Sequence, residues 1–513
     1  MEVRGTIIPG FNDAHAHLDA EGLRGHFPSL GGVKSIADVL ARIAMLAAQT
    51  PKGQWVITMP VGSPPYYYGG PKTLAEGRMP DRHELDRAAP DHPVCILPPS
   101  SYWGLIPCYA ALNTAALALN GIDRNKSPRV QGIEIERDAA GEPTGVLVDR
   151  NYPDIMQSDL LPALPRFTAA DRRAGILRAM KTYHAFGTTS IYEGHGCIPE
   201  IVDIYRDLRR TRELTMRTVL VASPLWRSMP EAEREMREAL SHARGAGSGD
   251  NMLKVSGVFV NYRGDPAAAS VSLSDPTNLG WSCYAKQAND PDVFEALCML
   301  AAEHDLRIHT VVIDKLHEIV PILERVDARV GLSGRRWVLE HISATRLSDL
   351  ERLQALGVGV TLIPEFHLSK GGMRFAAMPE ADAELVAPLK QLAALGVPVS
   401  AGTDNSPPNP LATLRAAMTR RERTKRLEIG PRARVDVEVA LRAMTTNGAW
   451  LTFEEHEKGA LQAGNYADLA IFDKDLLSAT GETIETFSCL ATMVGGRFVH
   501  NQIDERFDKP LRF

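Results

Sequence analysis

The sequence of 513 residues lacks a hydrophobic run long enough to cross a membrane. No stretch approaches the roughly 18 consecutive apolar residues that a spanning helix needs. The N-terminus also lacks the charged-then-apolar layout of a signal peptide. The 6 cysteines are scattered and form no C-x-x-C pair, which argues against a zinc ribbon or a disulfide framework. These absences predict a cytoplasmic protein with reduced thiols.

The sequence also has little that would attract a macromolecular partner. The net charge of -6 is spread without long runs, and no basic patch indicates nucleic acid binding. Neither the Rossmann glycine motif nor the P-loop stands at a strand-to-helix turn. With 44% hydrophobic residues, a chain of this length can bury a large barrel plus an accessory domain. We therefore expect a small-molecule substrate.

Strand-like and helix-like patterns alternate along most of the chain, which favours a parallel sheet with crossover helices. At this length a closed (β/α)8 barrel is the leading prediction, and an open doubly wound sheet is the alternative. The strands are expected at residues 94–97, 188–192, 214–222, 252–260, 306–312, 337–341, 358–363 and 397–401. The helices are expected at residues 169–186, 229–244, 291–304, 347–356 and 387–395.

Three regions depart from this alternation. Residues 123–150 and 263–289 have no clear pattern and are expected to be long loops over a binding site. After Gly459 the chain shows strand–turn–strand patterns without helices. We therefore predict a barrel domain over residues 1–455 and a small, partly truncated β-sandwich over residues 456–513. Its strands are too few to cover their own apolar faces, which must therefore pack against the barrel or another subunit. Because closed two-fold dimers are the commonest assembly, we predict a homodimer.

The pair His15 and His17 follows a short apolar stretch and a Pro-Gly turn signal. Residues i and i+2 of a strand point to the same face, about 7 Å apart along the strand. Two imidazoles placed in this way can bind one divalent ion, and imidazole suits zinc. The alternative is a pair of surface histidines.

Further along the chain, predicted strands repeatedly end in residue types that bind metals. His309 and His341 end two successive strands, and Asp404 ends a third. In a barrel the carboxyl ends of the strands meet at one mouth, so these residues and the two N-terminal histidines are expected to converge. Taken singly, His309 could be a core histidine and Asp404 a turn residue.

At this point the chain resembles the amidohydrolase superfamily, in its YtcJ-like branch (amidohydrolase family 3). The resemblance covers nearly the whole chain, from Gly5 to about Val499. The segments that carry the resemblance are residues 9–18, 111–117, 141–147, 339–341, 402–404 and 459–469. The first and the last of these are strong marks of the superfamily, and the second and third point to the YtcJ-like branch.

The resemblance implies a distorted (β/α)8 barrel that binds one or two divalent ions, usually zinc. His15 and His17 match the first-strand ligands, and His309 and His341 match those of the fifth and sixth strands. Asp404 matches the eighth-strand carboxylate, which also serves as the general base. Lys254 stands where the family carries a fourth-strand lysine that is often carbamylated and bridges two metal ions. The alternative for Lys254 is an ordinary strand lysine.

The sequence departs from the branch where substrate would be held. The third strand ends in Glu193 and His195, which would bind substrate or a metal ion, or else cap the next helix. Trp103, Trp281 and Phe366 fall in the expected mouth loops and are candidates for an aromatic substrate pocket. The family's substrate range therefore transfers poorly to this chain.

The expected chemistry is metal-dependent hydrolysis. Coordination lowers the pKa of water from ~15.7 to about 7, and the ion polarises the scissile carbonyl. Asp404 takes the proton from the attacking water and passes it to the leaving group. We predict hydrolysis of a non-peptide C–N bond in an amide, cyclic amide or N-acyl group. The alternatives are lactone or ester hydrolysis, deamination of a ring, and a non-catalytic metal-binding barrel.

Overall fold

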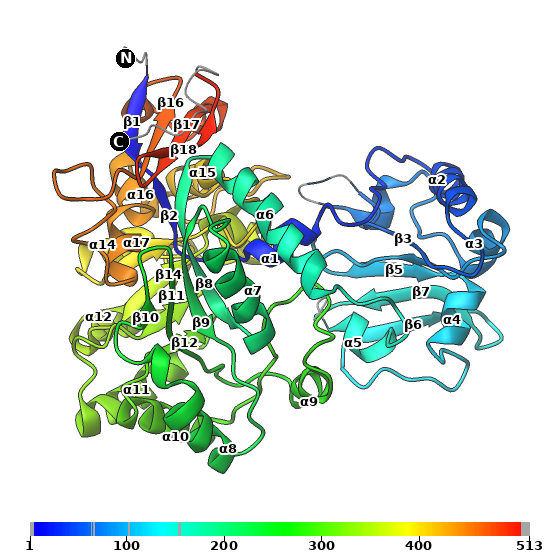
Figure 1. The fold of residues 1–513 in the computed structure, drawn as a ribbon, viewed down its shortest axis with the longest axis horizontal. Helices are drawn as coiled ribbons and strands as arrows, with labels where there is room; N and C mark the ends of the chain where they lie inside the picture. Colours follow the sequence, from blue (N-terminus) through cyan, green and yellow to red (C-terminus); the bar gives the residue numbers. More distant parts are fainter. Residues whose placement is uncertain (1–4, 63, 65–66, 101–102, 152–154, 504–513) are drawn as a thin grey trace. The chain divides into compact units, whose positions relative to one another are not determined.

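The computed structural model describes residues 5–62, 64, 67–100, 103–151 and 155–503 (Figure 1). The chain divides into two compact units, and each is described by itself. The first unit comprises residues 1–18, 176–263 and 288–513, and the second comprises residues 19–175 and 264–287. None of the described helices is long and apolar enough to cross a membrane.

The first unit is built on a nine-stranded sheet whose main strands are parallel. Their order across the sheet is β15-β14-β13-β12-β11-β9-β8-β2, and β10 (Ser248–Gly249) pairs antiparallel with β11. The main strands are β2 (Phe11–Asp13), β8 (Thr188–Cys197), β9 (Arg217–Ala222), β11 (Leu253–Phe259), β12 (Ile308–Val311), β13 (Val338–Glu340), β14 (Gly359–Leu362) and β15 (Val399–Ala401).

The two end strands of this sheet meet, which gives it the form of a distorted barrel. The backbone N–H of Ala14, just after β2, donates to the carbonyl of Ala401 in β15 at 3.2 Å. Every residue of β8 and β9 is buried, as expected for parallel strands covered on both faces. The predicted α/β barrel is therefore confirmed.

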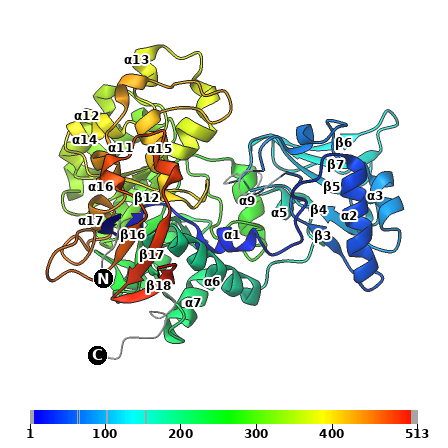
Figure 2. The ribbon, with the colours of Figure 1, turned by 90° about the horizontal axis from the view of Figure 1, so that it is seen from above.

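Helices alternate with these strands and surround the sheet (Figures 1 and 2). Proline occupies the first helical position of α7, α10 and α15, where its missing N–H costs nothing. The helices are α6 (Ala169–Ala185), α7 (Pro199–Arg210), α8 (Met229–Arg234), α10 (Pro291–Glu303), α11 (Leu316–Val330), α12 (Leu347–Leu356), α13 (Glu380–Ala383), α14 (Leu389–Ala394), α15 (Pro410–Thr419), α16 (Val437–Ala443) and α17 (Thr446–Leu451). The helix expected over residues 229–244 ends early, and a π turn over Glu235–Ala239 follows it.

The C-terminal strands join the N-terminal end of the chain in a second sheet of the first unit. The order is β1-β16-β17-β18, with all neighbours antiparallel (Figure 1). These strands are β1 (Thr6–Pro9), β16 (Leu469–Phe472), β17 (Cys489–Val494) and β18 (Arg497–Asn501). Because β1 pairs with β16, this sheet combines strands from both ends of the chain. The domain boundary at residue 455 stays a prediction.

The second unit has its own sheet, in the order β3-β4-β5-β7-β6. Its strands are β3 (Val56–Thr58), β4 (Val94–Ile96), β5 (Cys108–Leu112), β6 (Ile133–Arg137) and β7 (Pro143–Asp149). Its helices are α1 (Leu18–Leu23), α2 (Ile36–Gln49), α3 (Arg82–Ala88), α4 (Thr114–Leu119), α5 (Met156–Leu160) and α9 (Pro266–Ser274). The loop expected over residues 123–150 is thus wrong: β6 and β7 form an antiparallel hairpin there.

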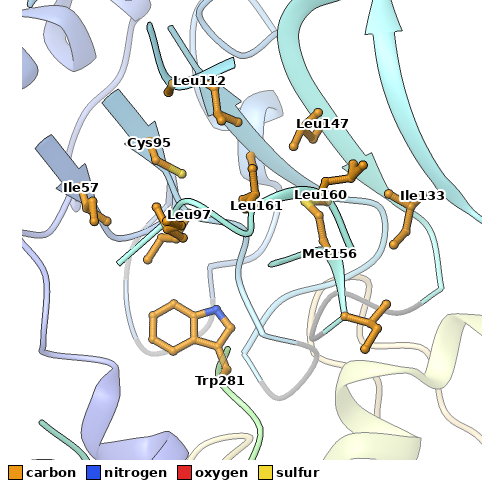
Figure 3. Packing of buried hydrophobic residues seen from close by; sticks show 14 of the residues in the cluster. Ile57, Cys95, Leu97, Leu112, Ile133, Leu147, Met156, Leu160, Leu161 and Trp281 are labelled. Carbon is orange, nitrogen blue, oxygen red and sulfur yellow. The ribbon is translucent and has the colours of Figure 1, made fainter. Parts of the chain in front are cut away.

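The core of the second unit surrounds Trp281, whose indole N–H donates to the carbonyl of Pro98 at 3.1 Å (Figure 3). Aliphatic side chains pack around the indole, among them Leu97, just after β4, and Leu161, just after α5. The ring of Trp103 packs edge-to-face on that of Trp281, with centroids 5.0 Å apart. Segment 264–287 therefore contributes to a hydrophobic core, where a loop over a binding site was expected.

Candidate active site

Four of the predicted ligands lie together just beyond the carboxyl ends of barrel strands. His15 and His17 follow β2, His341 follows β13, and Asp404 follows β15. All four are buried. We call these four residues the His–Asp cluster. Its place in the barrel is the one where active sites of this architecture are built.

The cluster is tight enough for its side chains to share one ion. Oδ1 of Asp404 lies 3.3 Å from Nε2 of His17 and 3.9 Å from Nε2 of His15. Nε2 of His341 lies 3.1 Å from Nε2 of His15 and 3.9 Å from Oδ2 of Asp404. One potential ligand atom each from His15, His341 and Asp404 lies within 4.8 Å of the other two.

The backbone holds two of these residues in the left-handed region. His341 has φ +58° and Asp404 has φ +49°, a conformation that costs energy for residues other than glycine and that recurs at functional sites. The backbone N–H of Asp404 donates to the carbonyl of His15 at 2.8 Å. The strand ends that carry the cluster are therefore fixed directly to each other.

Burial sets the protonation of the histidines. It lowers the pKa of His15 well below its usual value, and neighbouring imidazoles, His341 first, lower it further. Burial also lowers the pKa of His341. Both rings are therefore neutral at neutral pH, which is the form that binds metal ions. Among the described residues, Nδ1 of both rings and Oδ1 of Asp404 lack a hydrogen-bond partner.

Two glutamates lie beside the cluster. A carboxylate oxygen of Glu193, in β8, contacts Nδ1 of His17. Glu340 is fully buried, and burial raises its pKa to about 8. A carboxylate on the far nitrogen of a metal-binding histidine orients the ring and makes it a better ligand. The imidazoles and the Asp404 carboxylate, with Glu193 as the outer partner of His17, fit a divalent ion such as zinc.

His195 also lies at the cluster. Its ring centroid is 4.6 Å from that of His15 and 5.1 Å from that of His17, and it stacks on His341 at 5.1 Å. Phe366 meets His341 edge-to-face at 5.9 Å and is half-buried. The structure thus brings Glu193, His195 and Phe366 to the place where we expected them.

Lys254 lies elsewhere. It is the second residue of β11, so it stands near the amino end of a strand, whereas the cluster lies beyond carboxyl ends. Its ammonium group pairs with Glu454 at 3.2 Å and donates to the carbonyl of Thr452 at 3.5 Å. The structure therefore does not bring Lys254 to the cluster, and its placement gives no support to a bridging carbamate.

His309 is close to the cluster without joining it. Its Nδ1 contacts the hydroxyl of Tyr192, which donates to Oε1 of Glu340 at 3.2 Å. Burial lowers the pKa of His309 well below its usual value. Trp103 and Trp281 are fully buried in the core of the second unit described above.

Sequence reasoning missed the residues that fix the eighth strand to the first. Asp13 accepts hydrogen bonds from the backbone N–H of Thr403 at 2.9 Å and from its hydroxyl at 2.6 Å. The side-chain oxygen of Asn405 accepts from the backbone N–H of His17 at 3.1 Å, and its amide donates back to the carbonyl of His17 at 2.7 Å. Their adjacency to predicted ligands was the available signal.

The chain is similar to known proteins in sequence and in fold. A sequence model described as the amidohydrolase family matches residues 5–500. The chain is 23% identical to a putative amidohydrolase YtcJ of Bacillus subtilis, covering 98% of this chain and 90% of that protein. It is 26% identical to an N-substituted formamide deformylase of Arthrobacter pascens, covering 97% and 89%. An uncharacterized metal-dependent hydrolase from Pyrococcus horikoshii has a similar fold, with a TM-score of 0.65 and 21% identity, covering 93% and 87%.

Proposed function

Because this chain belongs to the amidohydrolase family and is a hydrolase, we propose that it hydrolyses a non-peptide C–N bond at the His–Asp cluster. The observation that carries the proposal is the environment of His17. Glu193 contacts Nδ1 of its ring, while Nε2 lies 3.3 Å from Asp404. This order of carboxylate, imidazole and second carboxylate is typical of a metal-ligating histidine with its outer partner.

The four residues of the cluster would hold a divalent ion, and zinc is the ion that we propose. When bound, such an ion lowers the pKa of water and polarises the scissile carbonyl. Asp404 has the position of the general base: it accepts a proton from the attacking water and returns it to the leaving nitrogen. Asp13 and Asn405 keep Asp404 and His17 in register through the hydrogen bonds given above.

The substrate class is proposed from two supports. The formamide deformylase relative is named for a reaction on N-substituted formamides. Phe366 places an apolar ring beside His341, which suits a substrate with an apolar substituent near the scissile group. Amides with an N-formyl or N-acyl group are therefore the first compounds to test.

The test is an assay of the zinc-loaded enzyme against a panel of N-substituted formamides, N-acyl amino acids, cyclic amides, lactones and amino-heterocycles. We expect release of an amine from at least one amide, and its loss in an Asp404→Asn variant. Turnover of lactones alone, or of amino-heterocycles alone, would replace the proposal with the corresponding alternative. Zinc binding with no turnover of any compound would favour a non-catalytic barrel.

A further inference from the structure

The second barrel strand, β8, brings to the cluster a histidine that the spacing of the predicted ligands did not require. We propose that His195, and not His309, completes the donor set when the His–Asp cluster binds a divalent ion. The inference rests on the proposed function, because it concerns the same ion.

His195 is placed as a ligand should be. One potential ligand atom each from His15, His17 and His195 lies within 4.8 Å of the other two, and all three residues are buried. The ring also stacks on His341 with an interplanar angle of 28°. His15 is shared with the group that contains His341 and Asp404. The two groups thus meet at His15, and imidazole and carboxylate donors of this kind suit zinc.

The path of β8 explains how His195 gets there. The strand runs on to Cys197, and its register against β9 shifts between Glu193 and Cys197. Such irregularities re-aim side chains next to active sites. Gly194 permits the close approach, since a Cβ there would lie 2.6 Å from Nδ1 of His15. Glu193 and His195, two residues apart, both reach the cluster.

His309 belongs to neither of these donor groups. Its Nδ1 contacts the hydroxyl of Tyr192. Among the described residues its Nε2 has no hydrogen-bond partner, and it lies against Gly257 of β11, where a Cβ would be 2.5 Å away. His309 is therefore a positioning residue, linked to the cluster through Tyr192 and Glu340. The chain would use the second barrel strand, which the sequence analysis counted as the third, where the family pattern suggested the fifth.

The experiment measures zinc binding without substrate. Wild-type protein, H195N, H309N and the control H367N are stripped of metal and titrated with zinc against a chromophoric chelator. His367 is a matched control because it is buried, its ring lies 5.7 Å from that of His341, and it belongs to neither donor group. We expect H195N to weaken zinc binding by more than ~100-fold, beyond the ~10–100-fold that loss of an outer partner costs. H309N and H367N should lose less than H195N.

The outcomes separate this inference from the function. If H309N loses as much affinity as H195N, or more, the inference is overturned. If wild-type protein binds no zinc, the proposed function fails with it. Should H195N fail to fold, a crystal structure of zinc-loaded wild type, with zinc located by anomalous scattering, decides the matter. His195 at about 2.0–2.1 Å from zinc supports the inference, and His309 at that distance with His195 beyond it overturns it.

Discussion

At the scale of single residues, the members of the cluster differ in what they would contribute. His15 is common to both donor groups, so we propose that it would act by holding the ion. Asp404 lies against three imidazoles and is also the group placed to accept a proton. Binding and proton transfer can therefore be separated by substitution.

We expect His15→Ala to lose zinc and activity together, because it removes the shared ligand. Asp404→Asn should lower kcat by ~10²–10⁴-fold, the usual contribution of a general base, and reduce zinc content far less. Zinc content by atomic absorption and kcat on the best substrate check both. Equal losses of metal and rate in the two variants would contradict the separate role of Asp404.

We propose that Glu193 acts as the outer hydrogen-bonding partner of His17. Replacing its carboxylate with an amide in E193Q should weaken zinc binding by ~10–100-fold, because Nδ1 of His17 loses its charged partner. Chelator competition measures the effect. The matched control is E200Q, at an exposed position in α7, and it should bind zinc like wild type. An E193Q protein with unchanged zinc affinity would remove Glu193 from the site.

The sequence could predict the cluster residues because each directly follows a short apolar strand. It could not predict how far along its strand a residue lies, and therefore whether its side chain reaches the mouth of the barrel. Lys254 and His309 are each the second residue of their strands, so they lie below the mouth, and only the register of β11 and β12 reveals this. The partners of Trp103 and Trp281 come from segments far apart in sequence, which no local pattern encodes.

At the scale of elements, β11 is tied to the segment after α17 by a buried ionic group. Glu454 pairs with Lys254 at 3.2 Å and with Lys458 at 2.7 Å, and Lys458 also donates to the hydroxyl of Ser190 in β8 at 2.6 Å. Burial acts to raise the pKa of Glu454, but the two ammonium groups outweigh it and lower the pKa to about 2. This carboxylate therefore stabilises the fold in its charged form.

The sign of the resulting pH dependence follows from that pKa. A carboxyl group with a depressed pKa contributes stability above its unfolded pKa of 4.5 and loses it as pH falls toward about 2. We expect E454Q to lower the free energy of unfolding by about 3–5 kcal/mol at pH 7, since the buried Lys458 and the half-buried Lys254 lose their charged partner. The difference from wild type should shrink below pH 4.5. Urea unfolding at pH 7, 4 and 3 measures it.

The control for this substitution is E457Q, which changes an exposed glutamate in the same segment. It should leave the free energy of unfolding nearly unchanged at every pH. A constant difference between E454Q and wild type from pH 7 to 3 would contradict the ionic explanation and leave only a packing effect.

Pattern reasoning located the elements of the barrel better than those of the second unit. Apolar strands of the barrel stand out because they are buried on both faces. The hairpin of β6 and β7 was missed because only one face of β6 is buried, and Ile133 and Ile135 alternate with charged residues. That alternation was visible in the sequence and was overlooked.

At the scale of the whole molecule, the four-stranded sheet ends in β1 on one side and β18 on the other. An open strand edge is a template for pairing with a strand of another chain. We therefore keep the prediction of a homodimer, and light scattering should give about twice the chain mass of 56.1 kDa. A mass of one chain across a range of concentrations would rule it out.

Metal should also change the stability of the whole molecule. A ligand that binds only the folded state at 100 times its Kd stabilises it by ≈ 2.7 kcal/mol. We expect zinc to raise the Tm of the stripped protein and a chelator to lower it, as measured by calorimetry. In H15A the same additions should leave the Tm unchanged, and a shift of wild-type size there would place the stabilising ion elsewhere.

The junction between β2 and β15 bears on how this protein reaches its native state. His17 and Asn405, which form hydrogen bonds across that junction, are separated by 388 residues. The barrel can therefore close only after its last strand has been synthesised and has paired with the first. Contacts between such distant segments form late. Since His15 and His17 stand on one side and Asp404 on the other, an ion held between them would cross-link the two strands that are synthesised furthest apart in time. Metal supply during biosynthesis would then govern the yield of closed barrels as well as the rate of the reaction.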